Sequence, residues 1–274
     1  MTHPLAKTLA DTYIANFWSA DQDIEWLATE QERQLVLARN PDIILVGRVD
    51  GLGRTPDGDI FFLENKTMSA YRGKYMADEK MKWRTDPQAL TYGVLVPEAK
   101  RFVVRWAVKP DPKSKTPVPK CDFEWYSYTQ AEVDHWRGQI IQIATEILEY
   151  RERGLIPWRT NFGNCFRYGL KYACPFYDKC SRQAWAESMG KPRIPHLMIE
   201  REQNSLDKAK LARDTVVLDA SRIGDYLECP EAYRRKWEGE GYQEESEALV
   251  IGTDFHQIVS QNISTLMEKS HART

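Results

Sequence analysis

Hydrophobic and polar residues follow one another along this chain in patterns that predict helices and strands in succession. Five segments are predicted helices, from apolar residues at helical spacing or from capping residues: 4–18, 86–96, 129–153, 221–237 and 248–270. Four segments are predicted strands, from apolar runs or rough alternation: 24–38, 43–52, 59–67 and 101–108. This succession predicts an α/β fold with a central mixed sheet of about four strands flanked by helices.

A tight turn joins two of the predicted strands. Pro56, Asp57 and Gly58 lie between the apolar segments 43–52 and 59–67, and these residue types favour a short connection. The two strands are therefore expected to form an antiparallel hairpin. The segment 109–120 is rich in proline and lysine and is predicted to be a loop.

Composition narrows the class of protein. The 274 residues are 42% hydrophobic, which suffices for one sizeable core. No apolar run approaches a membrane span, and the first residues contain no signal-peptide core, so a soluble cytoplasmic protein of a bacterial or phage-infected cell is expected. The net charge of −2 argues against a passive DNA-coating protein but fits an enzyme with carboxylates at a metal site.

The clearest candidate chemistry lies in the predicted hairpin. Glu64 and Lys66 are two positions apart on a strand, so their side chains project from the same face. Asp50 ends the preceding strand, and its carboxylate can approach that of Glu64. Two carboxylates repel unless a cation neutralises them, and hard oxygen ligands suit Mg²⁺ or Mn²⁺. A metal and a lysine can together activate water against a phosphodiester, although an ordinary surface ion pair is the alternative.

The predicted helix after this hairpin adds two further polar residues. Gln88 and Tyr92 are four residues apart and share a helical face, which can hold a nucleotide or steady Lys66. Nearby basic residues are candidates for phosphate contacts, with a solvated surface as the alternative, and include Arg84 and Lys82. The full set of such residues is Arg72, Lys74, Lys80, Lys82, Arg84, Arg234, Arg235 and Lys236.

The motifs GRVDG, LENKT and QALTY, in this order, resemble the RecB-like branch of the PD-(D/E)XK nuclease superfamily. The resemblance covers most of the chain and implies a restriction-endonuclease-like core. It implies that Asp50 and Glu64 bind the metal, joined by the backbone carbonyl of Asn65. It also implies that Lys66 serves the attacking water, and that the glutamine and tyrosine of QALTY line the DNA path.

Three cysteines lie close together after the last long predicted helix. Cys165, Cys174 and Cys180 suggest a soft-metal site, and their spacing does not match the paired cysteines of a zinc ribbon. In the family that the chain resembles, three late cysteines join an early Cys-Pro motif around a 4Fe–4S cluster. The resemblance assigns that fourth place to Cys229. Cys121 is the alternative fourth ligand, and bound zinc is the alternative to iron.

The segment that resembles the beginning of such a nuclease lies at the end of this chain. SRIGDYLECPEAYRRKW and GTDFHQIV match the expected order of helix, Cys-Pro and Gly-x-x-x-His, which makes His256 a metal ligand by resemblance. The chain is thus similar to a circularly permuted family member. Three explanations remain open: the chain closes on itself, it swaps its C-terminal helices in a homodimer, or it is a piece of a larger or split reading frame. In the last case its own site lacks a true partner; a recombination partner protein is also a candidate partner.

Together these features predict a metal-dependent DNA nuclease with a structural 4Fe–4S cluster. The expected organisation is a nuclease core with three cluster cysteines in 1–180, a connector in 181–213, and a helical segment in 214–274 that completes the core. An exonuclease acting on DNA ends or single strands, in recombination, repair or phage DNA processing, is expected. The rivals are a non-cleaving module that binds DNA or protein, and a zinc-stabilised nuclease; the choice between exonuclease and endonuclease stays open.

Overall fold

The computed structural model describes residues 3–115, 117–153, 161, 164–165, 174, 176–177, 180, 215–238 and 247–271. The chain divides into two compact units. Unit 1 comprises Met1–Leu35, Val46–Arg137 and Glu244–Thr274, and unit 2 comprises Val36–Leu45 and Gly138–Gln243. The C-terminal residues 247–271 thus belong with the N-terminal half of the chain, whereas 215–238 belong to unit 2. The predicted connector 181–213 lies outside the described residues.

The strands form one mixed sheet in the order β1-β2-β3-β4-β5, and β6 pairs with β2. Their bounds are β1 Glu25–Ala38, β2 Asp42–Arg54, β3 Ile60–Met68, β4 Arg101–Val108, β5 Lys120–Ser127 and β6 Thr215–Leu218. Strands β2 and β3 are antiparallel, which confirms the predicted hairpin. Strand β4 is parallel to β3, β5 is antiparallel to β4, and β6 is parallel to β2.

The α/β class and the four predicted strands are confirmed, but the expected number of about four strands is wrong. The described part of the chain has six, because β5 and β6 were missed. Strand β5 directly follows the Pro/Lys-rich loop, and its apolar residues Cys121, Phe123 and Trp125 alternate with charged residues instead of forming a continuous apolar run. Strand β6 has only four residues, too few for a periodic signal.

The helices match the predicted segments with two differences. Their bounds are α1 Pro4–Gln22, α2 Ala70–Gly73, α3 Met76–Lys82, α4 Pro87–Leu95, α5 Gln130–Arg153, α7 Ala220–Glu228, α8 Pro230–Tyr233 and α9 Glu247–His271. The short helices α2 and α3 occupy a stretch for which no helix was predicted. The predicted helix 221–237 is divided, because Cys229 is extended between α7 and α8 and a π-helical segment, η3 (Arg234–Glu238), follows. No helix among the described residues combines the length and apolar character needed to cross a membrane.

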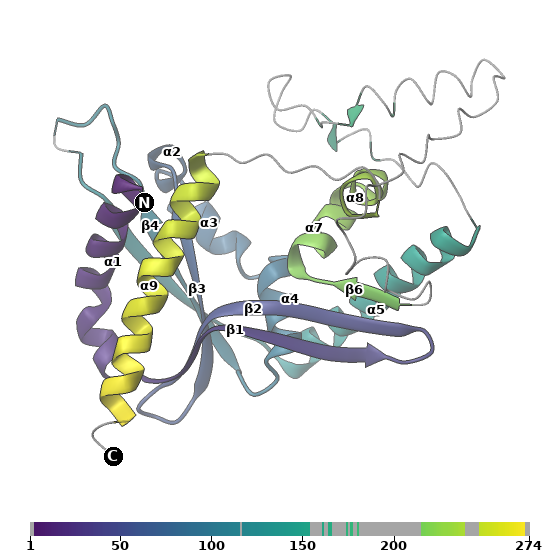
Figure 1. Cartoon of the computed structure of the whole chain (residues 1–274), viewed down its shortest axis with the longest axis horizontal. Helices are drawn as coiled ribbons and strands as arrows, with labels where there is room; N and C mark the ends of the chain where they lie inside the picture. Colours follow the sequence, from purple (N-terminus) through teal and green to yellow (C-terminus); the bar gives the residue numbers. More distant parts are fainter. Residues whose placement is uncertain are drawn as a thin grey trace. The chain divides into compact units, whose positions relative to one another are not determined.

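In unit 1, α1 and α9 lie side by side against the sheet (Figure 1). Alternate residues of β3 point to opposite faces, so Phe61 and Leu63 join the core under these two helices. From α9, the residues Ile251, Phe255, Val259, Ile263 and Leu266 enter the same core at helical spacing. The apolar stripe of the last helix is therefore buried against elements from the first half of the chain.

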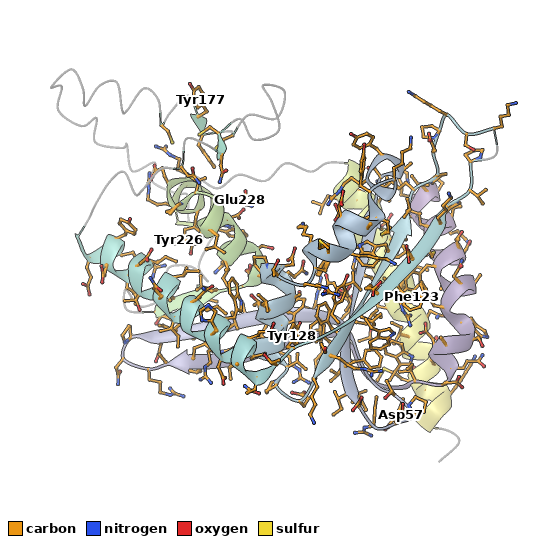
Figure 2. All side chains as sticks on the ribbon, turned by 180° about the vertical axis from the view of Figure 1, so that it is seen from behind. Asp57, Phe123, Tyr128, Tyr177, Tyr226 and Glu228 are labelled. Atoms are coloured by element: carbon orange, nitrogen blue, oxygen red, sulfur yellow. The ribbon has the colours of Figure 1, made fainter. Side chains whose placement is uncertain are left out.

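The opposite face of the sheet carries an aromatic layer. Phe62 stacks on Phe102 with ring centroids 5.1 Å apart, and Phe102 stacks in turn on Tyr126 at 4.8 Å. Tyr128, at the end of this layer, donates its hydroxyl to the backbone carbonyl of Ala89 in α4 (Figure 2). Helix α4 is thereby fixed to the face of β3 from which Glu64 and Lys66 project.

Candidate metal centre

Asp50 and Glu64 face each other where the β2–β3 ladder ends. The ladder runs from Arg54 opposite Ile60 to Gly51 opposite Leu63, and Asp50 is the next residue of β2. Beyond this point the N–H of Asn65 donates to Oδ2 of Asp50 at 2.6 Å. A buried backbone donor needs an acceptor, so the Asp50 carboxylate takes the place that a β2 carbonyl holds further along the ladder.

Glu64 is buried beside Lys66, on the side of β3 that faces α4. Its side chain is 3% exposed, and its Oε1 lies 2.5 Å from Nζ of Lys66. The same Oε1 accepts a hydrogen bond from Nε2 of Gln88 at 2.7 Å, while Oε1 of Gln88 accepts from Lys66 at 3.0 Å. The amide of Gln88 thus bridges the carboxylate and the ammonium group.

Helix α4 aims Gln88 at this pair because of how the helix begins. The side chain of Asp86 accepts the Gln88 N–H at 2.9 Å and caps the helix, with Pro87 in the first turn. One turn later the Tyr92 hydroxyl lies 3.4 Å from Nε2 of Gln88 and donates to the carbonyl of Arg48 at 3.0 Å. The structure therefore brings Gln88 to Glu64 and Lys66, and Tyr92 to Gln88.

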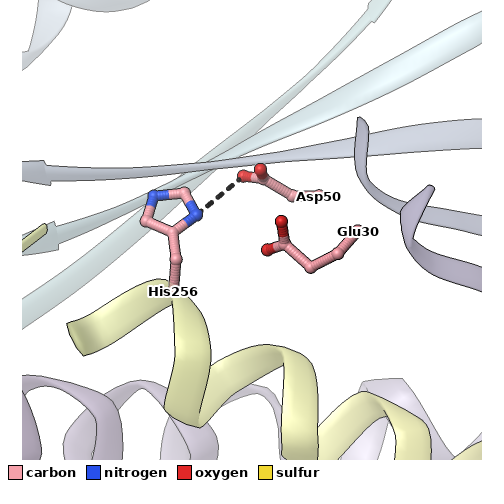
Figure 3. Close-up of side chains that lie close together, drawn as sticks. All are labelled: Glu30, Asp50 and His256. Atoms are coloured by element: carbon pink, nitrogen blue, oxygen red, sulfur yellow. Dashed lines mark ion pairs between the residues drawn. The ribbon is translucent and has the colours of Figure 1, made fainter. Parts of the chain in front are cut away.

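His256 reaches the same place from α9. Its Nδ1 lies 3.3 Å from Oδ2 of Asp50 (Figure 3). Two of the predicted ligands from distant segments of the sequence, Asp50 and His256, therefore meet in unit 1 of a single chain. Glu64, the third, lies near enough for its charge to act on His256 and for the charge of Asp50 to act on it. The apolar stripe of α9 accounts for this placement, because burying Phe255 under the sheet brings the neighbouring His256 to its edge.

Glu30 of β1 completes a group that was not predicted from the sequence. One ligand atom each from Glu30, Asp50 and His256 lie within 4.8 Å of one another (Figure 3). The backbone of Glu30 has φ of 48°, a conformation that few non-glycine residues adopt and that is found at functional sites. Its carboxylate also lies 3.0 Å from Nε of Arg48. Five polar residues surround Glu30 in the sequence TEQERQ, so no pattern distinguished it.

Burial and like charges shift the protonation of these groups. Burial raises the pKa of Glu64 to about 7; the charge of Asp50 acts in the same direction, and Lys66 opposes both. Burial and the charge of Asp50 also raise the pKa of Glu30. Burial by itself lowers the pKa of His256, but the hydrogen bond and charge of Asp50 outweigh it, so this pKa is raised. Each shift follows from negative charge confined in a buried site.

The residues fit a divalent cation. Oε2 of Glu64 is buried and has no hydrogen-bond partner among the described residues, an arrangement that a ligand would satisfy. The cluster Glu30, Asp50 and His256 supplies carboxylate oxygens and one imidazole nitrogen, a donor set suited to Mg²⁺ or Mn²⁺. The predicted role of the Asn65 carbonyl remains a prediction; the structure shows its N–H on Asp50.

The four cysteines predicted to bind a cluster lie in unit 2. Burial raises the pKa of Cys165, and the neighbouring thiols of Cys174 and Cys229 raise it further. Burial likewise raises the pKa of Cys180 to about 11, with smaller contributions from Cys229 and Cys174. The N–H of Cys174 donates to the carbonyl of Cys165 at 2.8 Å. Asn161 donates its N–H to Sγ of Cys229 at 3.4 Å and accepts from Sγ of Cys165 at 3.9 Å, so these cysteines share one region of unit 2. The other residues between 161 and 180 are largely outside the described part of the chain.

Cys121 has a different environment from these four. It lies on β5 in unit 1, opposite Ala107 of β4, and packs against the core under α1 and α9. Burial raises the pKa of its thiol to about 11. Cys121 is a packing residue in this structure.

The candidate phosphate-binding residues differ in their surroundings. Arg84 is exposed, and Lys82 is exposed with Nζ 3.5 Å from the carboxylate of Asp86. Arg235 is fully buried with Nε 2.8 Å from Oε1 of Glu231, so its prediction as a surface phosphate contact is wrong. The remaining candidates form ion pairs with acidic side chains: Arg72, Lys74, Lys80, Arg234 and Lys236.

Comparisons with known proteins do not assign a family. No protein-family model matches the chain, and no curated protein matches it. A solved protein of unknown function from Silicibacter pomeroyi aligns with 55% of this chain and 92% of its own, at 17% identity and a TM-score of 0.20. A likeness this weak carries no argument about fold or function.

The raised pKa of Glu64 predicts a pH dependence of stability in the metal-free protein. Between about pH 4.5 and pH 7 the folded state keeps a proton that the unfolded state has released, so the unfolding free energy falls as pH rises through this range. The Glu64→Gln variant lacks this contribution, and its stability should fall less. Urea denaturation in EDTA, from about pH 5 to about pH 8, measures both slopes.

Glu32→Gln, which changes an exposed carboxyl of β1, is the control and should keep the wild-type slope. Equal slopes in the wild type and in Glu64→Gln would show that the Glu64 carboxyl does not hold a proton in this range.

Proposed function

We propose that this chain is a metal-dependent DNA nuclease of the PD-(D/E)XK type. It acts as an exonuclease on DNA ends or single strands. The observation that carries the proposal is the buried Glu64 carboxylate. Lys66 and Gln88 both contact its Oε1, whereas its Oε2 has no partner in the described part of the chain, and the Glu30, Asp50 and His256 cluster is nearby. A purely structural ion pair would not need three further ionisable groups beside it.

The residues of the site can be given roles from their contacts. Glu30, Asp50, Glu64 and His256 would hold Mg²⁺ or Mn²⁺. A divalent cation bound there would neutralise negative charge on the scissile phosphate and lower the pKa of a bound water. Lys66 holds a positive charge beside the ligands, in position to stabilise the negative charge that develops on the phosphate.

Gln88 orients Lys66, and Tyr92 contacts Gln88. The amide of Gln88 fixes both the Glu64 carboxylate and the Lys66 ammonium group, so it limits the directions in which Lys66 can point. Lys66 also lies 5.4 Å from the ring centroid of Trp83, a cation–π contact that supports the same orientation. With a side chain that is 31% exposed, Lys66 remains accessible to a substrate.

The cysteines of unit 2 support the second part of the proposal, a 4Fe–4S cluster with a structural role. Cys165, Cys174, Cys180 and Cys229 are free thiols, and they lie close enough to affect one another's protonation. Four thiolates are the donor set of a 4Fe–4S cluster. Such a cluster would tie Cys229, between α7 and α8, to the segment that follows α5.

The nuclease proposal predicts metal-dependent cleavage that requires Lys66. End-labelled single- and double-stranded DNA should be degraded with Mg²⁺ or Mn²⁺ and remain intact in EDTA. Lys66→Met keeps the length of the side chain and removes its charge, so the cleavage rate should fall by about 100-fold or more. Lys7→Met, which changes an exposed lysine of α1 paired with Asp11, should cleave like the wild type.

A folded Lys66→Met protein that cleaves at the wild-type rate would contradict the assignment of Lys66. DNA binding by the wild type without any cleavage would favour the non-cleaving module instead. The products from the two labelled ends distinguish an exonuclease, with its ladder from one end, from an endonuclease.

The cluster proposal predicts a brown protein after anaerobic purification, with iron and sulfide in equal amounts. Cys229→Ser removes one thiolate ligand and should reduce both the colour and the iron content. Cys121→Ser should leave them unchanged, because Cys121 packs in the core of unit 1. A colourless wild-type protein that contains zinc would contradict the iron–sulfur assignment and support the zinc alternative.

A further inference from the structure

A chain of buried polar side chains runs behind Asn65, on the opposite side of β3 from Lys66. It consists of Tyr13 and Asp21 of α1, Arg105 of β4 and Asn65 itself, each at most 5% exposed. The Tyr13 hydroxyl donates to Oδ1 of Asn65 at 2.6 Å. Nη1 of Arg105 donates to the Tyr13 hydroxyl at 3.3 Å, and the guanidinium group binds both Asp21 oxygens, at 3.1 and 2.7 Å.

The sheet register explains how these residues meet. Asn65 and Arg105 are direct partners in the parallel β3–β4 ladder, so their side chains leave the sheet on the same face, toward α1. The Arg105 guanidinium also lies 4.3 Å from the ring centroid of Phe17. Tyr13 packs against Phe17 and Phe255, with ring centroids 4.8 and 5.5 Å away.

The donors and acceptors of these four side chains allow the hydrogen bonds between them to run in only one direction. Arginine has donors only, so the Tyr13 oxygen must accept from Arg105, and its own proton goes to Asn65. The Asn65 amide oxygen is therefore held toward Tyr13. The backbone N–H of the same residue donates to Oδ2 of Asp50, the oxygen that His256 also approaches. The polar chain thus ends on a proposed metal ligand.

A buried ion pair costs free energy unless all of its polar atoms have hydrogen-bond partners. The pair of Arg105 and Asp21 does not meet this condition. Nε of Arg105 is buried and lacks a hydrogen-bond partner among the residues that the structure describes. Apolar residues of similar volume could fill the space between α1 and the sheet at no greater cost. The network is therefore better explained by the position it gives to Asn65 than by its effect on stability.

We propose that Tyr13, Arg105 and Asp21 are positioning residues for the metal centre. They fix the Asn65 side chain, which fixes the adjoining backbone of β3 and through it the Asp50 carboxylate. The inference rests on the proposed function, because it assigns Asp50 to a cation. It goes beyond that function by adding residues that lie outside the Asp–Glu–Lys motif and touch neither the cation nor DNA.

The test is divalent-metal affinity in the Tyr13→Phe variant. The change removes one hydroxyl and keeps the aromatic contacts to Phe17 and Phe255. Mn²⁺ affinity, measured by calorimetry on the full-length protein without DNA, should fall about 10-fold, as expected when a partner of a metal ligand is lost. Tyr226→Phe is the matched control: it removes a buried hydroxyl that donates to Glu146 at 2.7 Å in unit 2, and Mn²⁺ affinity should not change.

A double-mutant cycle identifies the route through Asn65. Asn65→Ala removes the acceptor of the Tyr13 hydroxyl but keeps the backbone N–H that binds Asp50. If the effect passes through this side chain, adding Tyr13→Phe to Asn65→Ala should not weaken Mn²⁺ binding further. Additive losses would overturn the proposed route, and so would wild-type affinity in a folded Tyr13→Phe protein.

The outcomes separate this inference from the proposed function. A wild type that binds no Mn²⁺ would overturn both. A wild type that binds Mn²⁺ and cleaves DNA, with a Tyr13→Phe variant of equal affinity, would overturn the positioning role alone. If Tyr13→Phe does not fold, Asn65→Ala gives the decision, because its Mn²⁺ affinity should also fall about 10-fold.

Discussion

The confinement of several negative charges at the end of the β2–β3 ladder is the constraint on which the rest of the site depends. The β2–β3 ladder ends at Gly51 and Leu63, so Asp50 and Glu64 are the next residues of the two strands, and Glu64 is buried. Their repulsion has to be offset by positive charge or hydrogen bonds. The Lys66 ammonium, the Gln88 amide, the Asn65 N–H and His256 each do part of this. Among the residues that the structure describes, Oε2 of Glu64 nevertheless has no hydrogen-bond partner, and a divalent cation would complete the balance.

Helix α9 carries His256, one of the residues beside these charges, and also packs in the core of unit 1. Its apolar stripe shares a core with α1 and β3, and that packing is sufficient to bring His256 to Asp50 within one chain. The order of segments along the chain is therefore less important than the faces that they bury. Within unit 1 the last described helix packs beside the first and shares its core. This is the arrangement expected if the chain closes on itself.

Much of the candidate site could be predicted from the sequence, because residue spacing within a strand or helix determines which side chains share a face. Glu64 and Lys66 share a strand face because side chains alternate, and Gln88 points at them because Asp86 and Pro87 begin its helix at a defined residue. Glu30 could not be predicted, because its position depends on an unusual backbone conformation within a polar strand. The Tyr13–Asn65–Arg105 chain was also missed, since it depends on the register between β3 and β4. Strand β6 is too short for a periodic signal, whereas the alternation of Cys121, Phe123 and Trp125 in β5 was a usable signal beside a Pro/Lys-rich loop.

The most direct test of the central claim is the location of a bound ion. Crystals grown with Mn²⁺ should show an anomalous-scattering peak about 2.1 Å from carboxylate oxygens of Asp50 and Glu64, with His256 as a further ligand. The Glu64 oxygen that lacks a partner should be among the coordinating atoms. A structure in which Mn²⁺ is bound elsewhere, with Lys66 and Gln88 still the only partners of Glu64, would contradict the account.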